Sequence, residues 1–344
     1  MSKKDKLKKA DKLVKALNKE HGTDIVMRGA DMPEREFIPF SSPRANYLTR
    51  GGVPEGMVVE FFGAENSGKT TTALDILANF QEKYPDRLAL FLDAENTLDE
   101  EWGEEVGVDF DKVIVIKPTN QTGNTLLEMV IDSVETGDVG LVIVDSIPFL
   151  MSKSQFENDL DDSEYCGNSD LMTKFCRKVV PPASNHNCTI IMINQIRDVV
   201  GVHFTMYDTP GGHMLKHTYS QRIQFKKGKL LNKKYQEKPK SFESPMGHLV
   251  QLRLTKNKVT KNDRRLGNYT LNYDKNGIDV EKDTLDVAVE LGIIEQAGAW
   301  YSYESEELGK EVKEQGLANF LDALEDDREV FKDIKNKTNE QAII

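Results

Sequence analysis

Apolar residues recur along the chain with two different periods, and the way these periods alternate predicts the fold. From residue 57 onward, short apolar runs of strand length alternate with longer stretches in which apolar residues return at helical spacing. Apolar strands that alternate with amphipathic helices form a mostly parallel sheet covered on both faces, so we expect an α/β core. The predicted strands are 57–63, 88–95, 140–146 and 189–195, and the predicted helices are 70–84, 125–137 and 171–180.

The pattern differs on either side of this core. Before it, residues 5–20 carry a narrow apolar stripe that predicts a helix, formed by Leu7, Ala10, Val14 and Leu17. This helix can pack on its own domain or on a neighbouring subunit, and a short strand is predicted next, at 24–27. After the core, strand-like stretches between about 222 and 275 predict an antiparallel extension of the sheet. A small mixed segment follows, with helices near 283–291 and 316–326.

The charge of the chain restricts how it could bind nucleic acid. The net charge of the 344 residues is −12, which excludes a generally cationic surface, so any such binding must use a local feature. The segment 222–265 is one candidate, because it holds fourteen lysines and arginines against three acids, Glu237, Glu243 and Asp263. This segment is either a footprint for phosphates or a solvated basic face, and its charge alone leaves both open.

The composition is that of a globular protein, with 38% hydrophobic and 30% charged residues. The three cysteines form no CxxC pair and favour a reducing compartment. The charged N-terminus does not resemble a signal peptide, and the most apolar run, 141–150, contains Asp145. We therefore expect a soluble cytoplasmic protein without a membrane partner.

A glycine-rich segment between a predicted strand and a predicted helix carries the first chemical signal. GAENSGKT at 63–70 matches the P-loop pattern GxxxxGK[ST], in which backbone N–H groups and a helix N-terminus surround the phosphates of a nucleotide. Lys69 is expected to reach the β- and γ-phosphates, and the hydroxyl of Thr70 to bind Mg²⁺. The predicted phosphate-binding residues are Gly63, Glu65, Asn66, Ser67, Gly68, Lys69, Thr70 and Thr71.

Acidic residues end two other predicted strands and so face the sheet edge where the P-loop lies. Asp145 ends GLVIVD and is expected to hold Mg²⁺ through water, with Ser146 beside it. Glu95 ends LALFLDAE, where a carboxylate can orient and deprotonate an attacking water, although Asp93 competes for that role. Guanine recognition usually needs an NKxD element, whereas 257–260 reads NKVT, so ATP is favoured over GTP.

In order and spacing, the motifs of the chain resemble those of the RecA recombinases over residues 5–335. These motifs are GAENSGKT, FLDAENTLDEEW, VIVDSIPFL, MINQIR, TPGGHMLK, KNK at 256–258 and GAWYSY at 298–303. The resemblance implies a RecA-type P-loop ATPase that forms a helical filament on single-stranded DNA. This homo-oligomer would pair the strand with homologous double-stranded DNA and exchange strands, and DNA-stimulated ATP hydrolysis would then release it.

The resemblance also implies a division of the chain. The parts are an N-terminal oligomerisation segment at 1–33, an ATPase core with the DNA-binding loops at 34–277, a small α+β C-terminal domain at 278–337 and a tail at 338–344. Two rival functions use the same core: a ring-forming helicase, and an ATP-gated protein that coats DNA without exchanging strands. The helix and strand before residue 33 speak against the helicase, and the intact Glu95 speaks against the coating protein.

Within the ATP site, the resemblance assigns roles to residues outside the P-loop. Glu95 resembles the catalytic glutamate, and Gln195 resembles the residue that senses the γ-phosphate. Asp99 and Trp102 stand where the family contacts adenine, with Trp102 in place of the usual tyrosine. The lysines that reach the ATP of the adjacent subunit correspond to Lys256 and Lys258.

Two segments resemble the DNA-binding loops of the family. The first spans about 156–166 and is acidic here, and the second spans Arg197–Gly212. Apolar side chains of the second loop are expected to insert between base triplets, which suits any sequence because every base offers a flat face. The predicted DNA contacts are Tyr165, Arg177, Arg197, Val200, Phe204, Gly211 and Gly212.

Overall fold

The computed structural model describes residues 3–157, 167–198, 207–237, 244–261, 263–275 and 277–343. By their internal contacts, the residues form two compact units, Met1–Glu36 and Phe37–Ile344. Within the described ranges, no helix combines the length and the apolar character that a membrane span requires.

The first unit consists mainly of the helix α1 (Lys3–His21), which confirms the helix predicted at 5–20. The strand predicted at 24–27 is wrong for the single chain. The side-chain amide of Asn18 occupies both backbone groups of Val26, with N–O distances of 2.9 and 3.0 Å, where a strand would need a partner strand. Ile25 beside it is 76% exposed. A short 3-10 turn, Gly29–Asp31, follows.

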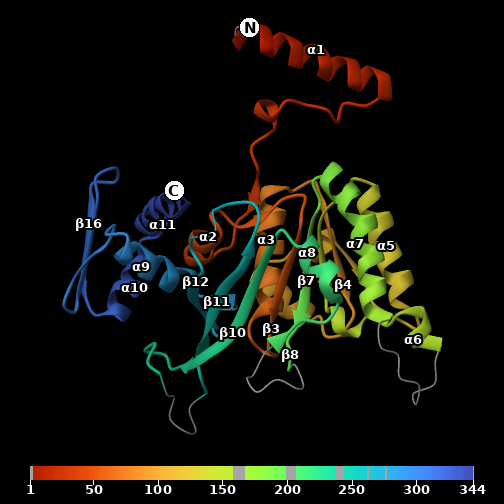
Figure 1. The fold of residues 1–344 in the computed structure, drawn as a ribbon. Helices are drawn as coiled ribbons and strands as arrows, with labels where there is room; N and C mark the ends of the chain where they lie inside the picture. The colour runs from red at the N-terminus through yellow and green to blue at the C-terminus, as the bar shows by residue number, and fades with distance from the viewer. Residues whose placement is uncertain are drawn as a thin grey trace. The chain divides into compact units, whose positions relative to one another are not determined.

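The second unit is built on a nine-stranded main sheet, counted within the described residues, in the order β13-β12-β11-β10-β3-β7-β6-β4-β5 (Figure 1). Six neighbouring strands are parallel: β3 (Val58–Gly63), β4 (Leu88–Asp93), β5 (Val113–Ile116), β6 (Val139–Asp145), β7 (Thr189–Gln195) and β10 (Gln221–Leu231). The antiparallel strands are β11 (Gly247–Asn257), β12 (Leu266–Asn272) and β13 (Gly277–Ile278). The mostly parallel sheet and its antiparallel extension are thus both confirmed.

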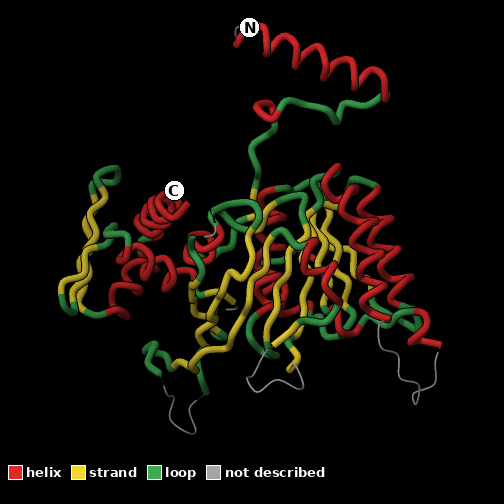
Figure 2. Tube along the Cα trace, in the orientation of Figure 1, coloured by secondary structure: helices red, strands yellow, loops and turns green. Residues whose placement is uncertain are grey.

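Helices cover both faces of the parallel strands, as the continuous apolar runs predicted (Figure 2). Because side chains alternate between faces, Leu141 and Ile143 of β6 pack in one core with α3 (Lys69–Lys83). Val142 and Val144 pack in the other core, with α5 (Gly123–Glu135), α7 (Gly167–Asn185) and α8 (Gly212–Thr218). Each fully buried aliphatic side chain stabilises the fold by about 1.5–3 kcal/mol, so the two cores hold the strand ends firmly in register.

The helix predicted at 171–180 is longer than expected and runs through Pro181 and Pro182 to Asn185. Proline normally ends a helix because it lacks an N–H donor. Here Val179 before the two prolines and Ala183 after them are both fully buried in the same core, so tertiary packing outweighs the local preference.

The C-terminal part carries a three-stranded antiparallel sheet, β14 (Glu295–Ala297), β15 (Trp300–Ser305) and β16 (Lys310–Gln315), with the helices α9 (Val280–Glu290), α10 (Leu317–Asp326) and α11 (Arg328–Ile343). Its own core includes Tyr303, Phe320 and Ile334. Helix α11 also contains residues that we assigned to a tail. Thr338 and Ala342 are buried there, and the Ala342 carbonyl accepts a hydrogen bond of 2.7 Å from Arg264.

Several short elements were not anticipated from the sequence, because each is too short to show a period. They are β1 (Phe37–Ile38), α2 (Pro43–Thr49), β2 (Val53–Pro54), α4 (Glu100–Val106), α6 (Lys153–Glu157), β8 (Arg197–Asp198), β9 (Tyr207–Asp208) and the 3-10 turns Phe110–Lys112 and Ile147–Phe149.

Candidate functional site

The glycine-rich segment forms a tight loop between β3 and α3, as its pattern predicted. A Cβ on Gly63 would lie 2.1 Å from the Phe225 carbonyl oxygen, so only glycine lets β10 approach β3 this closely. Gly68 has a φ of 90°, and Asn66 a φ of 53°. These left-handed positions turn the backbone around the space in front of the N-terminus of α3, where the helix dipole favours an anion.

Lys69 lies buried in this loop. Its Nζ donates to the Ala64 carbonyl at 2.8 Å, and the Ser67 hydroxyl donates to the same oxygen at 2.7 Å. Burial lowers the pKa of Lys69, while the carboxylates of Asp145 and Glu95 act in the opposite direction. A phosphate would add the strongest negative partner for this ammonium group, so the position suits the role predicted for it.

Thr70 and Asp145 meet at the carboxyl end of the sheet. Thr70 Oγ1 donates to Asp145 Oδ2 at 2.6 Å, which joins α3 to the end of β6. Burial raises the pKa of Asp145 to about 6, and the Thr70 hydroxyl partly offsets this. A hydroxyl and a buried carboxylate are hard oxygen ligands, and a divalent cation beside them would stabilise the carboxylate charge, so this pair fits Mg²⁺.

Asp93 and Glu95 make different contacts, which favour Glu95 for the predicted catalytic role. Both oxygens of Asp93 accept backbone N–H groups, from Thr97 at 3.0 Å and from Leu98 at 3.1 Å. Asp93 therefore forms a turn, with Asn96 at a φ of 55°, and β4 ends two residues earlier than we predicted. Glu95 lies beyond that end and lines the cleft in front of the P-loop.

Two donors hold the Glu95 carboxylate. Ser146 Oγ donates to Glu95 Oε1 at 2.5 Å, and Gln195 Nε2 donates to the same oxygen at 3.2 Å. The ends of β4, β6 and β7 thus converge on this one carboxylate. The resemblance predicted Gln195 as a sensor of the γ-phosphate, and Ser146 was expected beside Asp145. In the structure both side chains contact Glu95, and the role of Gln195 toward the phosphate stays a prediction.

A cleft of about 400 Å³ brings most of the predicted nucleotide residues together. Its lining also includes Thr97 and Ile193, to which the sequence assigned no role although both lie within the motifs FLDAENTLDEEW and MINQIR. The lining residues are Glu65, Asn66, Ser67, Gly68, Lys69, Thr70, Thr71, Glu95, Thr97, Asp145, Ile193 and Gln195. Predicted residues that are not part of this lining are Gly63, Ser146, Asp99, Trp102, Lys256 and Lys258.

Asp99 and Trp102 belong to α4. The Asp99 side chain accepts from Trp102 N at 3.2 Å and so caps the helix, and Trp102 packs partly buried against the core on the α3 side. These contacts are structural, and the adenine contact remains a prediction.

Lys256 and Lys258 lie back along the sheet from the chain's own P-loop. Lys256 pairs with Arg222 across β10 and β11, and Arg222 pairs with Glu60, three residues before the end of β3. The lysines therefore lie roughly 10 Å or more back along the strand direction from Gly63.

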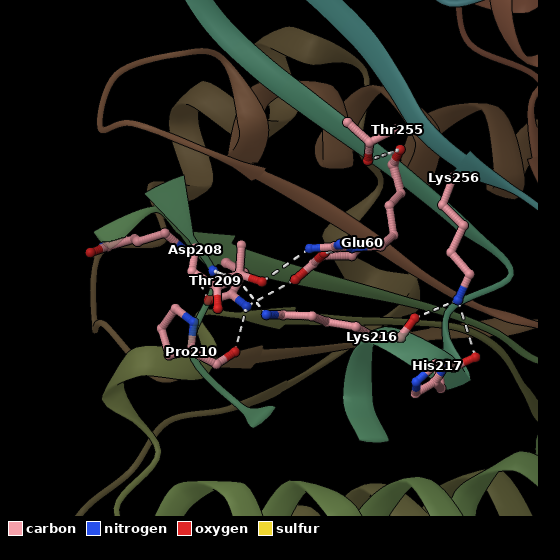
Figure 3. Close-up of polar contacts among 11 residues, drawn as sticks. Glu60, Asp208, Thr209, Pro210, Lys216, His217, Thr255 and Lys256 are labelled. Atoms are coloured by element: carbon pink, nitrogen blue, oxygen red, sulfur yellow. Dashed lines mark hydrogen bonds and ion pairs between the residues drawn. The ribbon is translucent and has the colours of Figure 1, made fainter. Parts of the chain in front are cut away.

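Both ammonium groups converge on one end of α8. Lys256 Nζ donates to the carbonyls of Lys216 and His217 (Figure 3). Lys258 Nζ donates to the His217 carbonyl at 2.6 Å. Two lysines with one residue between them thus reach the same oxygen. Burial lowers the pKa of Lys256 to about 8, and the charge of Lys258 adds to this.

The base of the second loop is a short hairpin. Arg197 of β8 pairs with Asp208 of β9, while Val200 and Phe204 lie outside the described residues. At the far end, Gly211 and Gly212 have φ values of 104° and 81° and begin α8. The predicted contact Tyr165 in the first loop also lies outside the described residues, and Arg177 is exposed on α7.

The ends of the two loops meet. A Cβ on Gly212 would lie 2.0 Å from the Ser169 hydroxyl of α7, and α7 begins directly after the first loop. Glycine is required at this contact, because both the φ and the space exclude a side chain.

The sequence matches a known family along most of its length. A family model described as the RecA N-terminal domain matches residues 8–278, and one described as the RecA C-terminal domain matches residues 282–342. "Protein RecA" of Staphylococcus carnosus (strain TM300) is 33% identical over 341 residues, which cover 98% of this chain and 91% of that protein. "Protein RecA" of Paracoccus denitrificans is 32% identical over 338 residues, with 97% and 90% covered. The chain belongs to the RecA family.

Proposed function

We propose that this RecA-family ATPase forms a helical filament on single-stranded DNA, pairs it with a homologous duplex and exchanges strands. The observation that carries this proposal is the hydrogen bond from Gln195 to Glu95. Glu95 lines the cleft in front of the P-loop, and one residue separates Gln195 from β8, the base of the second loop. A single side chain therefore connects the hydrolytic centre with a segment expected to hold DNA.

Hydrolysis depends on how the chain orients Glu95. Among the described residues, the hydrogen bonds to this carboxylate both end on Oε1, which leaves Oε2 to accept a proton from the attacking water. Lys69 and the loop N–H groups hold the phosphates, and Mg²⁺ held near Thr70 and Asp145 would neutralise their charge. When Gln195 turns its amide toward the terminal phosphate, its bond to Glu95 breaks, so ATP would change the start of the second loop.

DNA would bind where the ends of the two loops meet. Gly212 is the first residue of α8 and lies against Ser169 near the start of α7, so backbone N–H groups at both positions would face one phosphate backbone. Arg177 on the exposed side of α7 would add a phosphate contact. Such contacts are local, which suits a protein whose net charge is −12.

Assembly would complete the ATP site. Lys256 and Lys258 lie back along the sheet from their own P-loop, which supports the proposal that they reach a nucleotide on the next subunit. Ile25, exposed at 76%, could add a strand to the neighbour's sheet, since the backbone around it forms no strand within its own chain.

The experiment compares two DNA substrates, single-stranded DNA and a forked duplex, with the full chain and ATP. Single-stranded DNA should stimulate hydrolysis and yield helical filaments in electron microscopy, and Lys69→Ala should abolish both. Unwinding of a forked duplex would instead support a ring helicase. Filaments with near-absent ATP turnover would favour a coating protein.

A further inference from the structure

Glu60 is a buried carboxylate that neither the phosphate site nor the DNA contacts described above employ. Its side chain has 0% exposure, and Arg222 on the neighbouring strand donates from Nε to Glu60 Oε2 (Figure 3). The two residues are Cα partners in the parallel pairing of β3 and β10. A buried carboxylate destabilises the fold unless each of its oxygens accepts a hydrogen bond. The hydrogen-bond partners of Glu60 therefore determine the position of the segments that they join.

The second oxygen of Glu60 binds the end of β7. Asn194 Nδ2 donates to Glu60 Oε1 at 2.9 Å, and Asn194 Oδ1 accepts from the backbone N of Gln195 at 3.0 Å. Glu60 therefore fixes the residue next to Gln195, whose side chain contacts Glu95.

The same two partners of Glu60 hold the end of the second loop. Arg222 donates from its terminal nitrogen to Thr209 Oγ1 at 3.0 Å, and Asn194 Nδ2 also donates to the Pro210 carbonyl at 3.0 Å. These successive loop residues follow β9 and precede α8 (Figure 3). One buried carboxylate thus links the loop end to the strand that carries Gln195.

Packing around Arg222 and hydrogen bonds around Thr209 restrict how these side chains can move. The Arg222 guanidinium lies 4.8 Å from the centre of the Phe62 ring and 5.9 Å from that of Tyr219. On the loop side, Asp208 accepts from Thr209 N at 2.8 Å and pairs with Lys216 of α8. A shift of Thr209 and Pro210 must therefore also move Arg222 or Asn194, because a half-satisfied buried network is unfavourable.

We propose that Arg222 and Glu60 form a positioning unit that transmits DNA binding at the second loop to Gln195, and so sets the DNA stimulation of ATP hydrolysis. This inference rests on the proposed function. Neither residue touches the reacting atoms. DNA that displaces Thr209 and Pro210 pulls on Arg222 and Asn194, and Asn194 then reorients Gln195 at Glu95.

Two variants interrupt this unit at different points. Glu60→Gln with Arg222→Gln removes both charges together and leaves no unpaired buried charge. Thr209→Val removes only the hydroxyl that Arg222 contacts. The control is Glu55→Gln, which alters another buried carboxylate, bonded to Lys83 at 2.8 Å and to Tyr84 and Asn187.

The measurement is the ratio of ATP hydrolysis rates with and without saturating single-stranded DNA. We expect both variants to lower this ratio about tenfold, a typical size for coupling between sites, while Glu55→Gln keeps the parent ratio. Arg222→Lys should give an intermediate ratio, because one ammonium group keeps the charge but cannot bridge Glu60 and Thr209 as a guanidinium does.

Different results would contradict the role of Arg222 and Glu60 and the proposed function. A parent-like ratio in the double variant, or in Thr209→Val, removes the route through Arg222. Equal losses of both rates, which leave the ratio unchanged, would mean a purely structural role. A parent protein that DNA does not stimulate would contradict the proposed function itself.

Discussion

Thr70 donates a hydrogen bond of 2.6 Å to Asp145, so the first turn of α3 is fixed to the end of β6. This contact brings the P-loop and the carboxylate predicted to bind Mg²⁺ together from positions 75 residues apart in the chain. Glu95 and Gln195 meet beside it, and the cleft that results contains the groups that hydrolysis of ATP requires.

Glu95→Gln should slow ATP turnover by about 10²-fold or more, because the amide cannot accept the proton of the attacking water. The amide keeps an oxygen that can accept from Ser146, so ATP binding and ATP-dependent DNA filaments should persist. Steady-state hydrolysis and electron microscopy measure the two effects. Lys69→Ala is the contrasting variant and should lose both. Normal turnover in Glu95→Gln would remove this residue from the chemistry.

The sequence predicted the parts of the site that local patterns determine. The P-loop and Asp145 each lie at the junction of a strand and a loop, and a motif or an apolar run locates them. The end of β4 was placed too late, because the turn around Asp93 depends on bonds from its side chain to backbone that no apolar period reveals.

Contacts between residues far apart in the chain could not be predicted from the sequence. Glu60 lies 134 residues from Asn194 and 162 from Arg222, and each residue reads locally as an ordinary strand position. The extension of α7 through Pro181 and Pro182 could not be predicted either, because it depends on the burial of Val179 and Ala183 in the core. Family resemblance supplied roles for Lys256 and Lys258, but the convergence of both on the His217 carbonyl required the fold.

Arg177 and Phe204 should contribute differently to DNA binding. Arg177→Ala should reduce the salt dependence of affinity by about one phosphate contact, because a guanidinium displaces counterions from the backbone. Phe204→Ala should lose affinity with the slope unchanged, since stacking on bases releases no ions. Affinity measured across a range of salt concentrations separates the two. Both variants binding like the parent would refute our placement of the DNA contacts.

Lys256 and Lys258 should act on the ATP of a neighbouring subunit. Lys69→Ala should be inactive because it lacks the P-loop lysine. The double variant Lys256→Ala/Lys258→Ala should also be inactive, because it lacks charges worth about 10³-fold in rate. Mixing the two proteins should restore part of the DNA-stimulated hydrolysis, since some interfaces pair an intact P-loop with intact lysines. If the double lysine variant alone hydrolyses ATP like the parent, the site is not shared.

Asp283 should make the stability of the protein depend on pH. Its carboxyl accepts from the Ser42 hydroxyl at 2.5 Å and from Arg44 N at 3.1 Å, but burial dominates and raises its pKa to about 7. A raised folded pKa means that its contribution to stability is fully present below the unfolded value near 4 and is lost as pH rises through about 7.

The comparison of the parent with Asp283→Asn measures this effect. The free energy of unfolding of the parent, relative to the variant, should fall as pH rises from about 4 to about 7, by at most about 1.4 kcal/mol per pH unit. The other carboxyl groups are present in both proteins, so their contributions to the pH dependence of stability cancel in this comparison. Asp286→Asn, at a more exposed position of the same helix, is the control. A constant difference across this range would show that Asp283 does not titrate there.

Formation of joint molecules tests the recombinase function most directly. The full chain is incubated with ATP, circular single-stranded DNA and a linear duplex that is either homologous or unrelated, and the products are separated on a gel. A strand-exchange protein of this kind should convert the homologous pair into joint molecules, in the presence of ATP, and leave the unrelated pair unchanged. Filaments that form normally on the single strand but yield no joint molecules with the homologous duplex would contradict it.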